Sequence, residues 1–210
     1  MLTANCAHFD GAVLETRPFR HFSIENFIDE DVASSLLRWF EREAEWNAKS
    51  IAGLGTLSSV DLHTSKLGRQ LGFLTGERFL SNLRRQMGEL FATELEGFVD
   101  LTANRMMRTQ KIGAHNDIST LPPAFRFTHR LVLYLNHQYS EEYGGALRLA
   151  DTLSPSRSAS LQKRILPVHR SAVGFEISES SYHAIEPVRK GTRYSLSFTF
   201  YPGAGVMKFV

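Results

Sequence analysis

Residues 181–200 read SYHAIEPVRKGTRYSLSFTF, and they contain two stretches of β-strand character separated by a turn. The first stretch is YHAIEPV (182–188) and the second is RYSLSFTFY (193–201). Both are rich in β-branched and aromatic residues, and the intervening Arg189-Lys190-Gly191 is a turn signal. The sequence therefore predicts two antiparallel strands that lie next to each other.

This predicted strand pair contains two side chains suited to a functional site. Successive side chains of a strand alternate between its faces, so Arg193 and Ser195 share one face. A short connection is expected to turn His183 and Arg193 toward the same cavity. A buried arginine calls for an anion, because its charge is costly unless paired. The alternative is a core or turn histidine at 183 and a surface arginine at 193.

The rest of the chain places helices first and strands afterwards. Helical patterns cover residues 29–46 and 77–96, and Asp29 is the expected N-cap of the first. Their apolar positions are expected to be core: Val32, Ala33, Leu36, Leu37, Phe40, Phe79, Leu83, Met87, Leu90 and Phe91. Further strands are predicted at 101–107, 130–136, 145–150 and 171–177. This order predicts a β-sandwich or barrel buttressed by helices.

Two segments lack a clear period and are interpreted as loops. Residues 47–68 are rich in Gly and Ser, and residues 152–166 are largely polar with Ser and Pro. Both are long enough to reach over one end of a barrel. Each is either a lid over a site or a plain surface loop.

Composition limits the class of protein. The 210 residues fit one domain, with 42% hydrophobic and 22% charged residues. A net charge of +2 gives no support for nucleic acid or an anionic membrane as a partner. The single cysteine, Cys6, excludes an internal disulfide, and no apolar run is long enough to span a bilayer. These features predict a cytoplasmic protein of unknown oligomeric state.

A second motif, His115-Asn116-Asp117, lies within KIGAHNDIST (111–120). The pattern H-x-D alone is weak, because these residues are common in turns and His8-Phe9-Asp10 also matches it. With His183, however, it supplies two imidazoles and one carboxylate. That is the facial triad of non-haem Fe(II) oxygenases, which leaves coordination positions open for a co-substrate and O₂.

The ordered set of motifs resembles the Fe(II)/2-oxoglutarate-dependent dioxygenases, and most closely their prolyl 4-hydroxylase-like branch. The resemblance rests on H-x-D, the distal His183 and Arg193, together with RLVLYLN (130–136) and EEYGGALRL (141–149). The segment FSIENFIDEDVASSLLRWF (22–40) is similar to the N-terminal strand and helix of that branch. The similarity spans about residues 20–202. His8-Phe9-Asp10 has no such context and is set aside.

The resemblance implies a fold and a ligand set. The fold is a double-stranded β-helix, a cupin-like jelly-roll, in a single domain over 1–210 with a helical buttress at about 20–98 and a core at about 99–202. His115, Asp117 and His183 would hold Fe(II), and Arg193 would bind the far carboxylate of 2-oxoglutarate, helped by Tyr134 and Ser195. Relatives often have a tyrosine before H-x-D that is missing here, so Asn104 or Met106 is expected to face inward instead.

The resemblance also implies an activity. An aliphatic C–H of an amino-acid or peptidyl substrate, including prolyl, would be hydroxylated with O₂, releasing succinate and CO₂; ascorbate could act as reductant. A carboxylate at 117 favours hydroxylation over halogenation. Arg105, Arg108 and Arg126 are candidates for binding a substrate carboxylate. The alternatives are a non-catalytic cupin-like metal-binding or sensing module and a natural-product tailoring oxygenase (hydroxylation, desaturation) on a small molecule.

Overall fold

The computed structural model describes residues 6–118, 127–137, 139–153 and 162–202. Within these residues, two α-helices, α1 (Glu30–Arg42) and α2 (Glu77–Phe91), and two short 3-10 helices, η1 (Gly72–Thr75) and η4 (Glu141–Tyr143), accompany the strands. The strands are β1 (His21–Ile24), β2 (Asn47–Ile51), β3 (Gly55–Asp61), β4 (Leu95–Met107), β5 (Ile112–His115), β6 (His129–Tyr134), β7 (Leu147–Ala150), β8 (Lys163–Ile165), β9 (Ala172–Glu176), β10 (Tyr182–Ile185) and β11 (Thr192–Pro202).

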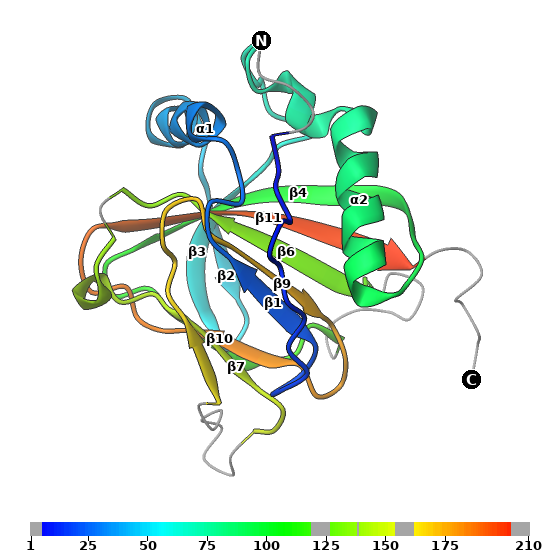
Figure 1. Ribbon diagram of the computed structural model, residues 1–210. Helices are drawn as coiled ribbons and strands as arrows, with labels where there is room; N and C mark the ends of the chain where they lie inside the picture. Colours follow the sequence, from blue (N-terminus) through cyan, green and yellow to red (C-terminus); the bar gives the residue numbers. More distant parts are fainter. Residues whose placement is uncertain (1–5, 119–126, 138, 154–161, 203–210) are drawn as a thin grey trace.

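The strands form one curved sheet in the order β1-β9-β6-β11-β4-β3-β5-β10-β7-β8, with β2 paired to β3. All of the pairings are antiparallel. The two ends of the sheet approach each other through Glu15, which bridges to His21 of β1 and accepts hydrogen bonds from Lys163 of β8 at 2.8 and 2.9 Å. The result is a nearly closed barrel (Figure 1), which confirms the predicted double-stranded β-helix.

The long strands β6 and β11 are amphipathic, and their alternation separates two compartments. On β6, Leu131 and Leu133 belong to the core beneath the helices, whereas Val132 and Tyr134 face the barrel interior. On β11 the same rule sends the apolar positions outward to the helices and a polar row inward, namely Arg193, Ser195, Ser197 and Thr199. The interior of the barrel is therefore polar along one wall.

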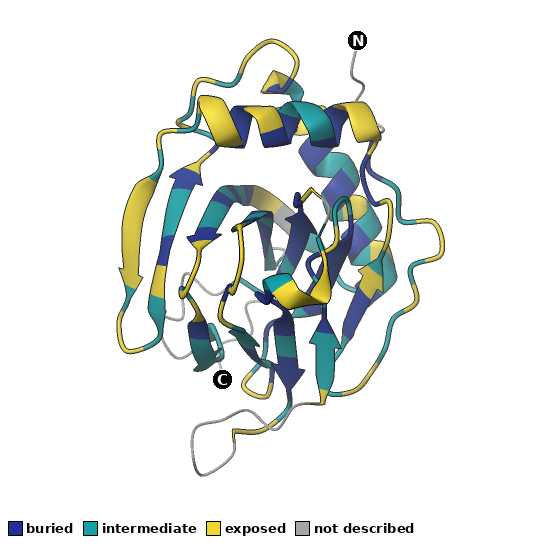
Figure 2. Cartoon of the chain, turned by 90° about the vertical axis from the view of Figure 1, so that its left-hand side faces the viewer, coloured by how far each residue is buried: buried dark blue, intermediate teal, exposed yellow. Residues whose placement is uncertain are grey.

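The helices cover the outer face of this sheet (Figure 1). The apolar face of α1 is buried as predicted, and on α2 Phe79, Leu83, Met87 and Phe91 are buried while Leu90 is partly so. Figure 2 shows the exposed residues of the helices on the side away from the sheet. No helix in the described parts of the chain is long and apolar enough to cross a membrane.

The structure corrects several sequence-based expectations. Residues 47–61, interpreted as part of a loop, form the hairpin β2–β3, so the segment 20–98 contributes strands as well as helices. The second helix ends at Phe91, where Ala92 adopts a left-handed conformation, and β4 begins at Leu95. Finally, β10 and β11 do not pair: β10 lies between β5 and β7, and β11 lies between β4 and β6. Asp29 stands at the N-cap of α1 but makes no side-chain cap hydrogen bond.

Candidate active site

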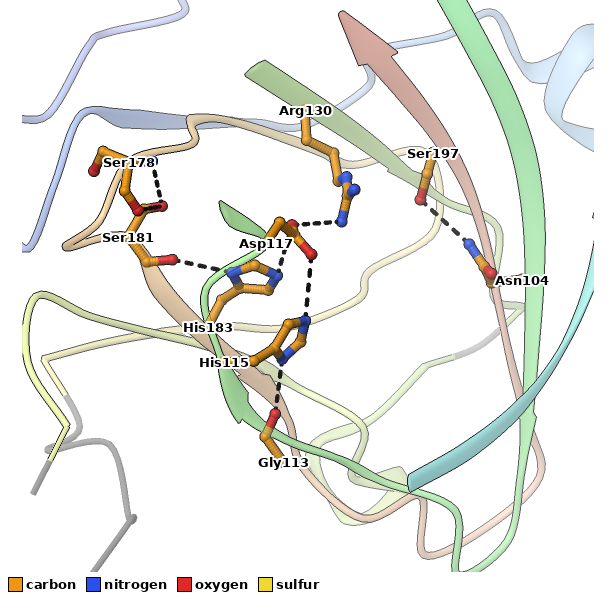
Figure 3. A network of polar contacts seen from close by, with 9 residues as sticks. All are labelled: Asn104, Gly113, His115, Asp117, Arg130, Ser178, Ser181, His183 and Ser197. Carbon is orange, nitrogen blue, oxygen red and sulfur yellow. Dashed lines mark hydrogen bonds and ion pairs between the residues drawn. The ribbon is translucent and has the colours of Figure 1, made fainter. Parts of the chain in front are cut away.

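His115, Asp117 and His183 converge inside the barrel (Figure 3). His115 ends β5 and pairs directly with His183 of β10, so the register of two strands sets their rings 4.4 Å apart. The Nε2 atom of His115 lies 3.5 Å from Asp117 Oδ1, and that of His183 lies 3.4 Å from Asp117 Oδ2. One ligand atom from each residue lies within 4.8 Å of the others, which suits a single metal ion.

Backbone carbonyls orient both imidazoles. Nδ1 of His115 lies 2.9 Å from the Gly113 oxygen, and Nδ1 of His183 lies 3.1 Å from the Ser181 oxygen. An Nδ1–H that donates to a carbonyl leaves the Nε2 lone pair for a metal, the usual arrangement behind metal-binding histidines. Burial lowers the pKa of His183 to about 4, so this ring is neutral at pH 7 and able to coordinate.

Asp117 is held in its charged form by its surroundings. Burial alone would raise the pKa of this carboxyl, but the positive charge of Arg130, the charge that His183 and His115 carry when protonated, and a hydrogen bond from His115 outweigh burial and hold the pKa well below the usual range. Nη1 of Arg130 lies 2.9 Å from Asp117 Oδ2. Two neutral imidazoles and one carboxylate are the donor set expected for Fe(II).

Arg193 lies in the same cavity, on β11 in the opposite wall of the barrel. It is 4% exposed, donates from Nε to the Gly145 oxygen at 2.8 Å and from Nη1 to Ser195 Oγ at 3.3 Å, and lies over the Tyr134 ring at 5.0 Å. Among the described residues no carboxylate pairs with Arg193, and the proton of the fully buried Tyr134 hydroxyl beside it has no acceptor. A buried cation and a buried donor without a partner fit the carboxylate of a ligand such as 2-oxoglutarate.

The His115–Asp117–His183 triad and Arg193 line one cavity of about 480 Å³. Its polar wall is the inner face of β4, β6 and β11, including Thr102, Asn104, Arg130, Ser195, Ser197 and Thr199. Its other walls are mainly apolar and include Ile51, Leu54, Leu57, Ile112, Leu147 and Ile185, with Lys49 on the β2–β3 hairpin. The hairpin that was expected to be irregular therefore does reach the cavity.

The inward residues expected in place of the missing tyrosine are present. Asn104 and Met106 both line the cavity, and Asn104 Nδ2 donates to Ser197 Oγ at 3.3 Å (Figure 3). This follows from period 2 on β4, where Thr102, Asn104 and Met106 share a face.

The alternation of side chains along β4 also explains why the arginines predicted to bind substrate do not reach the cavity. Arg105, between two inward residues of β4, lies over the Trp46 ring at 5.0 Å, and Arg108 is exposed just after the strand. Neither residue lines the cavity, so this part of the prediction was wrong. Arg126 and residues 154–161 of the second predicted lid lie outside the described residues.

The residue that sequence reasoning missed is Arg130. Its signal was available: counting back by two from Tyr134 reaches Val132 and then Arg130, all on the inner face of β6. In the motif that was set aside, His8-Phe9-Asp10, the His8 side chain has another partner, since its Nε2 lies 2.8 Å from Asp29 Oδ1.

A double-stranded β-helix that encloses a His–Asp–His cluster and a buried arginine defines the class of 2-oxoglutarate-dependent non-haem iron oxygenases. Residues 101–201 match the model of the 2OG-Fe(II) oxygenase superfamily, and this stretch contains the triad and Arg193. The match covers 101 of the 210 residues, and together with the fold and the site it supports a 2-oxoglutarate-dependent dioxygenase of this superfamily.

Similar solved structures include several prolyl hydroxylases. A prolyl-4-hydroxylase from Pseudomonas putida is 18% identical with a TM-score of 0.68, over 88% of this chain and 93% of that one. A Trichoplax adhaerens prolyl hydroxylase, in complex with a peptide fragment of the hypoxia inducible factor oxygen degradation domain, is 15% identical with a TM-score of 0.67, over 86% and 83%. A prolyl 4-hydroxylase from Phytophthora capsici is 24% identical with a TM-score of 0.64, over 89% and 59%. Comparison with curated proteins gave no match.

Proposed function

We propose that this protein hydroxylates an aliphatic C–H of an amino-acid or peptidyl substrate, using Fe(II), 2-oxoglutarate and O₂. The observation that carries the proposal is the placement in one cavity of a complete triad and of a buried arginine that has no carboxylate partner among the described residues. The reaction converts substrate, 2-oxoglutarate and O₂ into hydroxylated substrate, succinate and CO₂. One oxygen atom enters the new hydroxyl group and the other enters succinate.

Different side chains of the cavity would bind the metal and the 2-oxoglutarate. His115, Asp117 and His183 would hold the metal, which when bound supplies the oxidative chemistry. Arg193 would grip the far carboxylate of 2-oxoglutarate with its planar fork, while the Gly145 carbonyl and Ser195 hold the guanidinium in place. Tyr134 would donate its hydroxyl proton to the same carboxylate.

The fold likeness to prolyl hydroxylases supports a peptidyl or amino-acid substrate. The rival hypothesis of a non-catalytic cupin-like module predicts the loss of a ligand or of the arginine, and all four residues are present and face one cavity. Asp117 supports hydroxylation, because a carboxylate at this position occupies a metal coordination site that a halide would need.

The test is metal binding and succinate formation by the purified protein. We expect one Fe(II) per chain under anaerobic conditions, and succinate formation that requires both Fe(II) and 2-oxoglutarate, measured with and without ascorbate. His115→Ala, Asp117→Ala and His183→Ala should each abolish turnover and weaken Fe(II) binding. Full activity in one of these variants would remove that residue from the ligand set.

His8→Ala and Asp10→Ala are the matched controls, because they change the other H-x-D motif. Both should leave Fe(II) binding unchanged. If Fe(II) bound normally but no succinate formed under any condition, the hydroxylase proposal would fail and the binding-module hypothesis would be favoured.

A further inference from the structure

We infer that Arg130 binds the carboxylate of the substrate, and that the substrate is a free amino acid or short peptide with an unblocked α-carboxylate. The inference rests on the proposed function, because it names the substrate class of the same site. It differs from the sequence-based expectation, which assigned this role to other arginines.

The position of Arg130 separates it from the 2-oxoglutarate anchor. It lies four residues before Tyr134 on the inner face of β6, which at about 3.3 Å per residue is roughly 13 Å along the strand. Its Nη1 is 2.9 Å from Asp117 Oδ2, so its guanidinium lies beside the triad (Figure 3). A carboxylate bound there would bring the neighbouring carbon atoms of the substrate close to the metal.

The guanidinium has hydrogen-bonding capacity to spare. Within the described parts of the chain, its contacts are Nη1 with Asp117 and the guanidinium carbon over the Phe127 ring at 4.9 Å. Its Nε is buried and has no hydrogen-bond partner there. An arginine offers five N–H donors, and a carboxylate is the group that matches two of them at once.

The charges of the residues that line the cavity also support a carboxylate on the substrate. Asp117 is the one carboxylate among the described residues that line the cavity, whereas Lys49, Arg130 and Arg193 are cations. A divalent metal and the two arginines would carry four positive charges, and Asp117 and the dianionic 2-oxoglutarate would carry three negative charges. The cavity would then hold one net positive charge, without counting Lys49. A buried charge of this kind is costly unless an anion pairs with it. One substrate carboxylate would neutralise it.

The surroundings of Arg130 suit a small polar substrate. Thr199 is its register partner on β11, and Thr102, Asn104 and Ser197 continue the polar wall from there. The apolar residues Ile51 and Leu54 of the β2–β3 region line the cavity as well. A molecule with polar groups at one side and a hydrocarbon part at the other fits these walls.

A competing role for Arg130 is to orient Asp117 alone, and the experiment separates the two. The probes are the twenty L-amino acids and their glycyl dipeptides, each compared with its own carboxamide, together with N-acetylated prolyl peptide amides. Wild-type protein with Fe(II) and 2-oxoglutarate is assayed for succinate formation above the level without probe. We expect at least one free acid to stimulate succinate formation, with its amide requiring at least about ten times the concentration for half-maximal effect.

Arg130→Gln and Arg130→Lys then test the residue, with Arg105→Gln as the control from outside the cavity. In Arg130→Gln the preference for acid over amide should disappear, in Arg130→Lys it should survive in part, and in Arg105→Gln it should be unchanged. An orienting role alone would weaken acid and amide equally. Anaerobic Fe(II) titration of each variant measures separately how far the substitution weakens metal binding through Asp117.

The inference is overturned if acid and amide lose effect equally in Arg130→Gln, if no free acid stimulates, or if blocked prolyl peptides act as well as free acids. In each of those cases 2-oxoglutarate-dependent succinate formation by the wild type would leave the proposed function standing. Absence of any such succinate would count against the proposed function itself.

Discussion

The anchoring of 2-oxoglutarate by Arg193 gives a sharp quantitative prediction. The guanidinium is 4% exposed and has no carboxylate partner among the described residues, so a bound carboxylate would form a buried ion pair with it. Truncating one member of such a pair costs about 2–5 kcal/mol. At about 1.4 kcal/mol per factor of ten, Arg193→Ala should raise the KM for 2-oxoglutarate by about 30-fold to about 4,000-fold.

Two further variants at this anchor refine the prediction. Arg193→Lys should recover part of the loss, because it restores the charge but not the planar fork. Tyr134→Phe removes one hydroxyl donor and should cost about 1.5–3 kcal/mol, less than Arg193→Ala. Gly145→Ala should also raise the KM: Gly145 has a φ of +71°, and an added Cβ would lie 2.9 Å from Arg193 Cδ.

The assay is succinate formation against 2-oxoglutarate concentration, with Fe(II) binding and urea unfolding measured on the same samples. Arg193→Ala should bind Fe(II) normally, and the urea unfolding curve shows separately what the loss of its hydrogen bonds to Gly145 and Ser195 costs in stability. A KM for 2-oxoglutarate within about threefold of wild type would refute the anchor assignment.

Two predictions concern the fold and its pH dependence. Gly174→Ala should lower the free energy of unfolding by about 1–3 kcal/mol or more, because the new Cβ would lie 2.2 Å from Cε1 of the fully buried Phe22; an unchanged urea midpoint would contradict the packing described. Burial, reinforced by the charge of Arg20, lowers the pKa of His129 to about 4. The unfolded state, with a pKa near 6.5, therefore binds the proton first, and stability should fall by up to roughly 3 kcal/mol as pH drops from about 6.5 to about 4. His129→Leu should flatten this part of the stability curve measured by urea unfolding, and an identical slope would show that another group is responsible.

Local patterns in the sequence determined the strand faces. Period 2 correctly placed Arg193 and Ser195 together on the inner face of β11, and helical period correctly gave the buried faces of α1 and α2. These features depend on neighbours within a few residues, so a single element carries them whatever its surroundings. Helices followed by strands were likewise enough to predict the class of fold.

Elements that are not marked by a buried apolar face were harder to predict from the sequence. The hairpin β2–β3 was interpreted as a loop because four of the five residues of β2 are exposed, and an exposed strand shows no alternation of apolar and polar residues. The end of α2 was placed too late, because residues 92–96 continue its apolar pattern while Ala92 turns the chain out of the helix.

The partners of each strand were decided only by the tertiary structure. His183 and Arg193 do face one cavity, but from opposite walls, since β10 and β11 join different strands instead of each other. Likewise, period 2 places Arg130 on the inner face of β6, but only the curvature of the whole sheet brings it beside Asp117, which follows β5, while Arg105 packs on Trp46 outside. Sheet pairing joins residues far apart in the chain, and no local period encodes which strands meet.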